Sequence, residues 1–220
     1  MNEPHLIVIF GATGDLARRK LLPGVMHLIE SELVAECRII GVSLDEFDDD
    51  SFRNFAEEAC REHSTRSVSA EQWASFAKKL SYVNVKSGPE ALAKAAAVQE
   101  VELGGTPLRL HYLSVPPSAA LSAVRMLGEA NLVERSRVVM EKPFGTDLAS
   151  AVSLNANIHE IFSEQQIFRI DHFLGKEPAQ NILAFRFANG LFEPIWNRNF
   201  IDHVQIDVPE TLGLGKRVGF

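Results

Sequence analysis

The 220-residue sequence contains little cysteine, no excess of basic residues and no long hydrophobic run. Its 2 cysteines, Cys37 and Cys60, are too few for a disulfide framework, so we predict that both are reduced and structural. Lys and Arg number 22 against 29 Asp and Glu, and the net charge of −7 argues against nucleic acid or an anionic membrane as partner. The 46% hydrophobic and 23% charged residues are typical of a globular protein.

Targeting and membrane signals are also scarce. No apolar stretch approaches the roughly 20 residues that a membrane-spanning helix needs. The residues after Met1 lack the basic and apolar regions of a signal peptide. We therefore expect a soluble, cytoplasmic protein. No internal repeat and no linker rich in Pro, Gly or Ser divides the chain.

Short apolar runs alternate with helical patterns along most of the chain. This order predicts an α/β fold, a doubly wound Rossmann-like parallel sheet with helices on both faces. The expected strands are 5–10, 38–42, 82–85, 108–115, 137–140 and 167–170. The expected helices are 16–34, one opening at 48–51, 70–80, 90–101, 118–130, 146–162 and 177–187.

The pattern changes after Gly175. Residues 202–208 alternate in the manner of a half-buried antiparallel strand. We therefore predict a dinucleotide-binding domain over 1–175 and the incomplete start of an α+β domain over 176–220.

A glycine turn follows the first expected strand. Gly11 can form the tight turn, and Gly14 lets the backbone approach a phosphate without a Cβ in the way. The amides at the start of the next helix would face the anion, and Leu16 would anchor that helix on the sheet. The G-x-x-G spacing is also compatible with an ordinary strand–helix turn.

Four segments, in order, resemble the glucose-6-phosphate dehydrogenase family. The first is the turn with its flanks, GATGDLARRKLLPG, and the second is EKPFG at 141–145. The third, RIDHFLGKE at 169–177, is similar to the substrate segment of that family. The fourth is NILAFRFANGLFEPIWNRNFIDHVQI at 181–206.

The resemblance implies oxidation of D-glucose 6-phosphate to 6-phosphogluconolactone with hydride transfer to NADP, the first step of the oxidative pentose phosphate pathway. The implied substrate-binding residues are Lys142, His172, Lys176 and Glu210. The implied coenzyme-binding residues are Gly11, Ala12, Thr13, Gly14, Asp15, Leu16, Arg18 and Lys142. The family also implies a cis peptide before Pro143, homo-oligomers and no metal.

The same resemblance gives Asp171 a role in proton transfer. In the family an aspartate at this position orients a histidine that takes the C1 hydroxyl proton. That histidine belongs to a region beyond Phe220. We therefore expect an N-terminal portion that binds dinucleotide but has little or no activity alone. The alternatives are a catalytically dead binding module and one half of a split enzyme.

Two departures from the family pattern concern binding groups. Phe173 stands where a tyrosine is usual, which removes one hydroxyl donor to the phosphate. Leu44 stands where an arginine usually pairs with the 2′-phosphate of NADP, and Asp45 and Glu46 would repel that dianion. Either Arg18 or Arg19 compensates, or the preference shifts toward NAD. A further alternative is another Rossmann-type sugar oxidoreductase, with Lys142 of the EKP tripeptide as acid and base.

Overall fold

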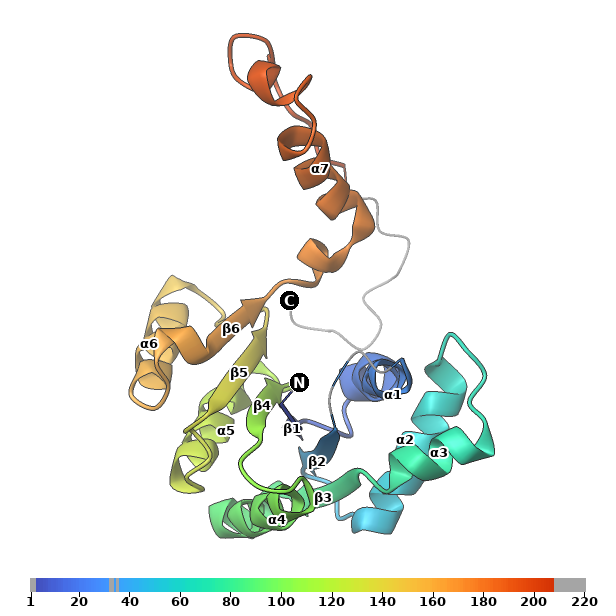
Figure 1. Cartoon of the computed structure of the whole chain (residues 1–220). Helices are drawn as coiled ribbons and strands as arrows, with labels where there is room; N and C mark the ends of the chain where they lie inside the picture. The colour runs from blue at the N-terminus through green and yellow to red at the C-terminus, as the bar shows by residue number, and fades with distance from the viewer. Residues whose placement is uncertain (1–2, 32–33, 35, 208–220) are drawn as a thin grey trace. The chain divides into compact units, whose positions relative to one another are not determined.

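The computed structural model describes residues 3–31, 34 and 36–207. The chain forms two compact units, Met1–Asp171 and His172–Phe220. The first unit holds a six-stranded sheet with the order β3-β2-β1-β4-β5-β6, visible in Figure 1. Every neighbouring pair of strands is parallel. The strands are β1 (His5–Phe10), β2 (Cys37–Ser43), β3 (Leu80–Asn84), β4 (Leu108–Leu113), β5 (Ser136–Glu141) and β6 (Ile167–Ile170). The doubly wound parallel fold is thus confirmed.

Helices cover both faces of this sheet (Figure 1). The helices of the first unit are α1 (Leu22–Glu30), α2 (Asp49–His63), α3 (Ala70–Ala77), α4 (Gly88–Glu102), α5 (Pro117–Glu129) and α6 (Leu148–His159). One cluster of buried side chains joins the sheet to α4, α5 and α6, and a second joins it to α1, α2 and α3.

Strand β1 explains why the continuous apolar runs form the centre of the sheet. Leu6, Val8 and Phe10 pack into the cluster beneath α4, α5 and α6. Ile9 packs into the opposite cluster beneath α1 and α2. Because successive side chains of a strand point to opposite faces, only a run apolar at every position suits a strand that is covered on both sides.

The two cysteines lie in this core as free thiols. Burial raises the pKa of Cys37 to about 11 and that of Cys60 to about 12. Both thiols therefore stay protonated and unreactive, and the prediction that they are structural is confirmed.

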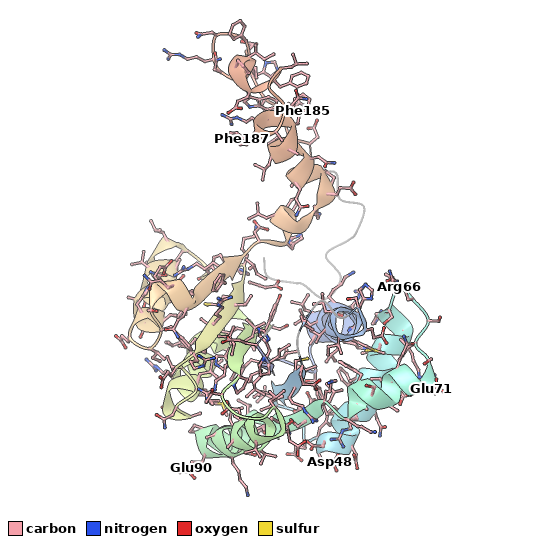
Figure 2. All side chains as sticks on the ribbon, viewed as in Figure 1. Asp48, Arg66, Glu71, Glu90, Phe185 and Phe187 are labelled. Carbon is pink, nitrogen blue, oxygen red and sulfur yellow. The ribbon has the colours of Figure 1, made fainter. Side chains whose placement is uncertain are left out.

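Two helix starts are fixed by carboxylate caps. Asp48, labelled in Figure 2, accepts a hydrogen bond of 2.8 Å from the Ser51 amide at the start of α2. Asp147 accepts one of 2.7 Å from the Ser150 amide at the start of α6. Each carboxylate satisfies an amide that has no partner within its helix.

The first helical segment differs from the expected single helix over 16–34. It contains a π-helical stretch, η1 (Ala17–Leu21), which continues directly into α1, and α1 ends at Glu30. Helix α3 likewise ends at Ala77 rather than Leu80, because Leu80 pairs with Ile39 as the first residue of β3.

The second unit contains helical elements and irregular backbone over its described residues. These are η4 (His172–Gly175), α7 (Glu177–Phe187) and η5 (Glu193–Ile195). Helix α7 has the predicted bounds, but the strand predicted over 202–208 is wrong for residues 202–207, which form no regular structure. A strand is held by hydrogen bonds to a neighbouring strand, and no residue from 172 to 207 belongs to a strand. Val208 lies outside the described residues.

Among the described segments, no helix combines the length and the apolar character needed to cross a bilayer.

Candidate active site

The glycine turn follows β1 at the carboxyl edge of the sheet, and its backbone allows no side chain at the first position. Gly11 has a φ of +73°, and a Cβ there would lie 2.1 Å from the carbonyl oxygen of Ser114. The amide of Gly14 donates to the carbonyl of Gly11 over 2.9 Å and closes the turn. The sequence prediction of a tight, glycine-dependent turn is confirmed in its geometry.

Several amides of the turn are used internally. Those of Gly11 and Ala12 donate to the Val42 carbonyl at 2.8 and 3.3 Å. The Arg18 amide donates to the Gly14 carbonyl at 2.9 Å, which is the hydrogen-bond spacing of an α-helix. Because the first turn of a helix has amides without intrahelical partners, the groups offered to a phosphate are those of Thr13, Asp15 and Leu16.

Small residues hold this turn against the sheet. Ala12 and Ala17 are fully buried, whereas Leu16, the predicted anchor, is only half-buried. A methyl side chain lets the start of the helix approach the strands closely.

Charged side chains around the turn are paired. The Arg18 guanidinium lies 2.8 Å from the Glu62 carboxylate and 5.8 Å from the centre of the Phe55 ring. Arg19 lies 3.9 Å from Asp15, one helical turn away. Arg18 is thus turned toward α2 and its acidic residue.

The side chain of Thr13 reaches across to the end of β2. Its hydroxyl lies 2.6 Å from the Ser43 hydroxyl and donates to the Asp45 carboxylate. The turn and the residues after β2 therefore form one connected polar edge.

Lys142 and Asp171 meet at the ends of β5 and β6. Glu141 and Ile170 are opposite each other in the parallel register, so the residues that follow them are also neighbours. The Lys142 ammonium lies 2.7 Å from an Asp171 carboxylate oxygen. The peptide between Lys142 and Pro143 is cis, as the family resemblance led us to expect.

A second pair beside Lys142 was missed in the sequence. The Tyr112 hydroxyl on β4 donates to the Glu141 carboxylate at the end of β5. Burial, with the adjoining carboxylate, raises the pKa of Tyr112, so its hydroxyl stays a donor. This hydrogen bond links β4 to β5, the strand that ends just before Lys142. Only the strand register, in which Leu113 faces Met140, brings these two side chains within reach.

His172, Phe173 and Lys176 share the turn that opens the second unit. The His172 and Phe173 rings lie 4.8 Å apart, and the Lys176 ammonium lies 4.2 Å from the centre of the Phe173 ring. The following helix offers fewer amides than expected, because Pro178 has none and those of Ala179 and Gln180 donate to the Lys176 carbonyl.

The remaining predicted site residue, Glu210, lies outside the described residues.

Two protein-family models match the chain. The family model "Glucose-6-phosphate dehydrogenase, NAD binding domain" matches residues 8–181, and the model of the C-terminal domain matches 183–220. The chain belongs to the glucose-6-phosphate dehydrogenase family. Its Rossmann-like sheet is the NAD binding domain of that family, with the glycine turn at its carboxyl edge.

Individual relatives agree with this assignment. The glucose-6-phosphate 1-dehydrogenases of Rhizobium meliloti and Zymomonas mobilis are 43% and 42% identical to the chain over 99% and 100% of its length. The chain spans 45% of the length of each.

Solved structures of the family resemble the fold as well. The glucose-6-phosphate 1-dehydrogenase of Mycobacterium avium superposes with a TM-score of 0.76 at 36% identity, over 90% of this chain and 42% of its own. A glucose-6-phosphate dehydrogenase in complex with glucose 6-phosphate gives a TM-score of 0.79 at 32% identity, with the same coverage.

Proposed function

We propose that this chain supplies the coenzyme- and sugar-phosphate-binding part of a glucose-6-phosphate 1-dehydrogenase. One observation carries the proposal: the glycine turn after β1 and the Lys142–Asp171 pair after β5 and β6 lie on the same carboxyl edge of one parallel sheet. Ligands of open α/β sheets bind at that edge. The oxidation of glucose 6-phosphate at C1 is proposed for the whole protein, because the chain spans 45% of the relatives named above.

The turn is proposed to hold the pyrophosphate of the dinucleotide. The amides of Thr13, Asp15 and Leu16 supply donors, and the helix dipole adds a favourable potential for an anion. The bound nicotinamide supplies the hydride acceptor.

Lys142 and Asp171 are proposed to work on the sugar. An ammonium beside the substrate binds hydroxyl or phosphate oxygens through charge-assisted hydrogen bonds. The reaction also releases the proton of the C1 hydroxyl, and Asp171 is the carboxylate that would orient a histidine base for it. The Lys142 ammonium, 2.7 Å away, holds this carboxylate at the end of β6.

His172 and Lys176 are proposed to bind the 6-phosphate, and Glu210 the sugar hydroxyls. A dianion needs polar donors that converge on it, and His172 opens η4 while Lys176 directly follows its last residue. Phe173 orients Lys176 through its ring but offers no hydroxyl, so the phosphate is held without that donor.

Ligand binding by the 220-residue chain tests this proposal without requiring turnover. We expect a saturating dinucleotide, at about 100 times its Kd, to stabilise the chain by about 2.7 kcal/mol, read as a rise in thermal midpoint. We expect Lys142→Ala to weaken glucose 6-phosphate binding by about 10-fold or more, because a charge-assisted hydrogen bond is lost.

The matched control is Lys94→Ala, which removes an exposed lysine of α4. If Lys142→Ala and Lys94→Ala weakened glucose 6-phosphate binding equally, the net charge of the chain would account for the effect, and the position of Lys142 would not. No stabilisation by either NAD or NADP would refute the proposed dinucleotide site.

A further inference from the structure

The carboxylate of Asp45 is fixed next to the glycine turn. It follows β2 at the carboxyl edge of the sheet and accepts the hydrogen bond from the Thr13 hydroxyl. Ser43, the last residue of β2, contacts the same hydroxyl over 2.6 Å. An acidic group at this place in a dinucleotide fold can accept hydrogen bonds from the adenosine ribose.

The backbone of this segment is anchored from β3. The Asp45 carbonyl accepts hydrogen bonds of 2.8 Å from the Tyr82 hydroxyl and 2.8 Å from the Asn84 side-chain amide. Asn84 also donates to the Leu44 carbonyl at 3.3 Å. Three contacts from a neighbouring strand keep Asp45 in position before any ligand arrives.

The surroundings of Asp45 are acidic. The segment from Asp45 to Asp50 contains five carboxylates and no basic residue, and Arg53 pairs with only two of them, Asp49 and Asp50. Glu46 and Asp48 line a cavity of about 550 Å³ beyond the ends of β2 and β3. A hydrogen bond between Asp48 and Ser51 lowers the pKa of the Asp48 carboxyl, so this group is ionised at neutral pH. A 2′-phosphate placed here would meet several negative charges.

The basic side chains near Asp45 either pair with carboxylates or lie beside acidic residues. Arg18 pairs with Glu62 at 2.8 Å, and Arg19 lies 3.9 Å from Asp15. Lys86 lines the same cavity as Glu46 and Asp48. Leu44, which is 64% exposed at the end of β2, offers no donor.

We infer that Asp45 accepts a hydrogen bond from the ribose 2′-hydroxyl of NAD and that the chain selects NAD over NADP, an inference that rests on the dinucleotide site proposed above. A 2′-hydroxyl donates to a carboxylate, whereas a 2′-phosphate is repelled by one. Asp45 is therefore a specificity-determining residue for the coenzyme.

The test measures dissociation constants for NADH and NADPH from nicotinamide fluorescence, with the 220-residue chain. We expect the value for NADPH to be at least about 10-fold larger, because one charge-assisted hydrogen bond separates the two ligands. Asp45→Asn should weaken NADH binding and bring the ratio close to one. Adding Leu44→Arg to Asp45→Asn should reverse the preference.

Glu46→Gln is the matched control, since it removes one negative charge from the adjacent position. It should leave the ratio nearly unchanged, and an effect as large as that of Asp45→Asn would overturn the role of Asp45. Lys86→Ala should also leave the preference for NADH in place.

Competition against the wild-type chain needs no variant. We expect 5′-AMP to displace NADH at lower concentration than adenosine 2′,5′-bisphosphate does. Equal binding of NADH and NADPH, or tighter binding of NADPH, refutes the preference but leaves the dinucleotide site standing. Binding of neither coenzyme refutes the site itself.

Discussion

At the residue scale, Gly11 is the position where the glycine turn depends on the absence of a side chain. Gly11→Ala would place a Cβ 2.1 Å from the Ser114 carbonyl oxygen at a φ of +73°. We expect a loss of at least about 2 kcal/mol in the free energy of unfolding, measured by urea denaturation, together with weaker dinucleotide binding.

Gly24→Ala is the control for that substitution. Gly24 lies in α1, and beyond its chain neighbours and the backbone of its own helix no atom lies within 4 Å of the position its Cβ would take. Because alanine favours a helix over glycine, the free energy of unfolding should rise by about 0.5–1 kcal/mol. Similar losses in both variants would contradict the proposed steric conflict.

His111 predicts a pH dependence of stability. Its Nε2 lies 2.8 Å from the Leu132 carbonyl oxygen, so Nε2 carries the proton of the neutral ring. Burial lowers the pKa of His111 to about 4 from its ordinary 6.5. Between these two pKa values the unfolded chain binds one more proton than the folded chain does. The stabilising contribution of the neutral, buried His111 is therefore complete above pH 6.5 and is lost as the pH falls toward 4.

We expect this group to lower the free energy of unfolding by about 2 kcal/mol between pH ~7 and pH ~5. His111→Gln removes the titration, so urea denaturation of that variant should show a shallower pH dependence. If the free energy of unfolding of His111→Gln depended on pH as steeply as that of the wild type, groups other than His111 would cause the loss of stability.

At the element scale, α7 and α5 have similar lengths and opposite environments. Helix α7 has 11 residues, none of them buried, and its Phe185 and Phe187 are 41% and 57% exposed (Figure 2). Helix α5 has 13 residues and buries five side chains, including Val124 and Leu127. Because an isolated helix shorter than about 12 residues is marginal in water, packing decides whether such a helix persists.

Hydrogen exchange measured by mass spectrometry compares the two helices in one sample. We expect the amides of α7 to exchange at least about 100-fold faster than those of α5, since their local opening requires little exposure of apolar surface. Equal protection of both helices would contradict this expectation.

At the scale of the whole molecule, the sequence predicted those features of the fold that the residue pattern of a single segment determines. The run from Leu6 to Phe10 is apolar at every position, which suits a strand covered on both faces, and the turn at Gly11 follows from backbone geometry. The strand expected over 202–208 failed for residues 202–207, because alternation does not supply the neighbour that a strand needs.

The sequence predicted residues of the candidate site, but it did not predict which side chains contact one another. Lys142 and Asp171 were identified from their motifs, yet their 2.7 Å pairing depends on the register of β5 against β6. The Thr13–Asp45 and Tyr112–Glu141 hydrogen bonds join residues 32 and 29 positions apart. Such contacts depend on how strands align, which a pattern along one segment does not record.

The contrast between the units also predicts where proteases act. Both buried clusters lie in the first unit, and no residue from 172 to 207 is buried. Trypsin cleaves backbone that can open locally, so we expect the first cuts at Arg186 and Arg198. Arg137 is the internal control, because its side chain is also exposed but its backbone is paired within β5 between two strands. Mass spectrometry of the early fragments should show the intact sheet unit, and Arg186→Gln should remove the first of these cuts. Cleavage at Arg137 as fast as at Arg186 would show that the sheet unit opens as readily as α7.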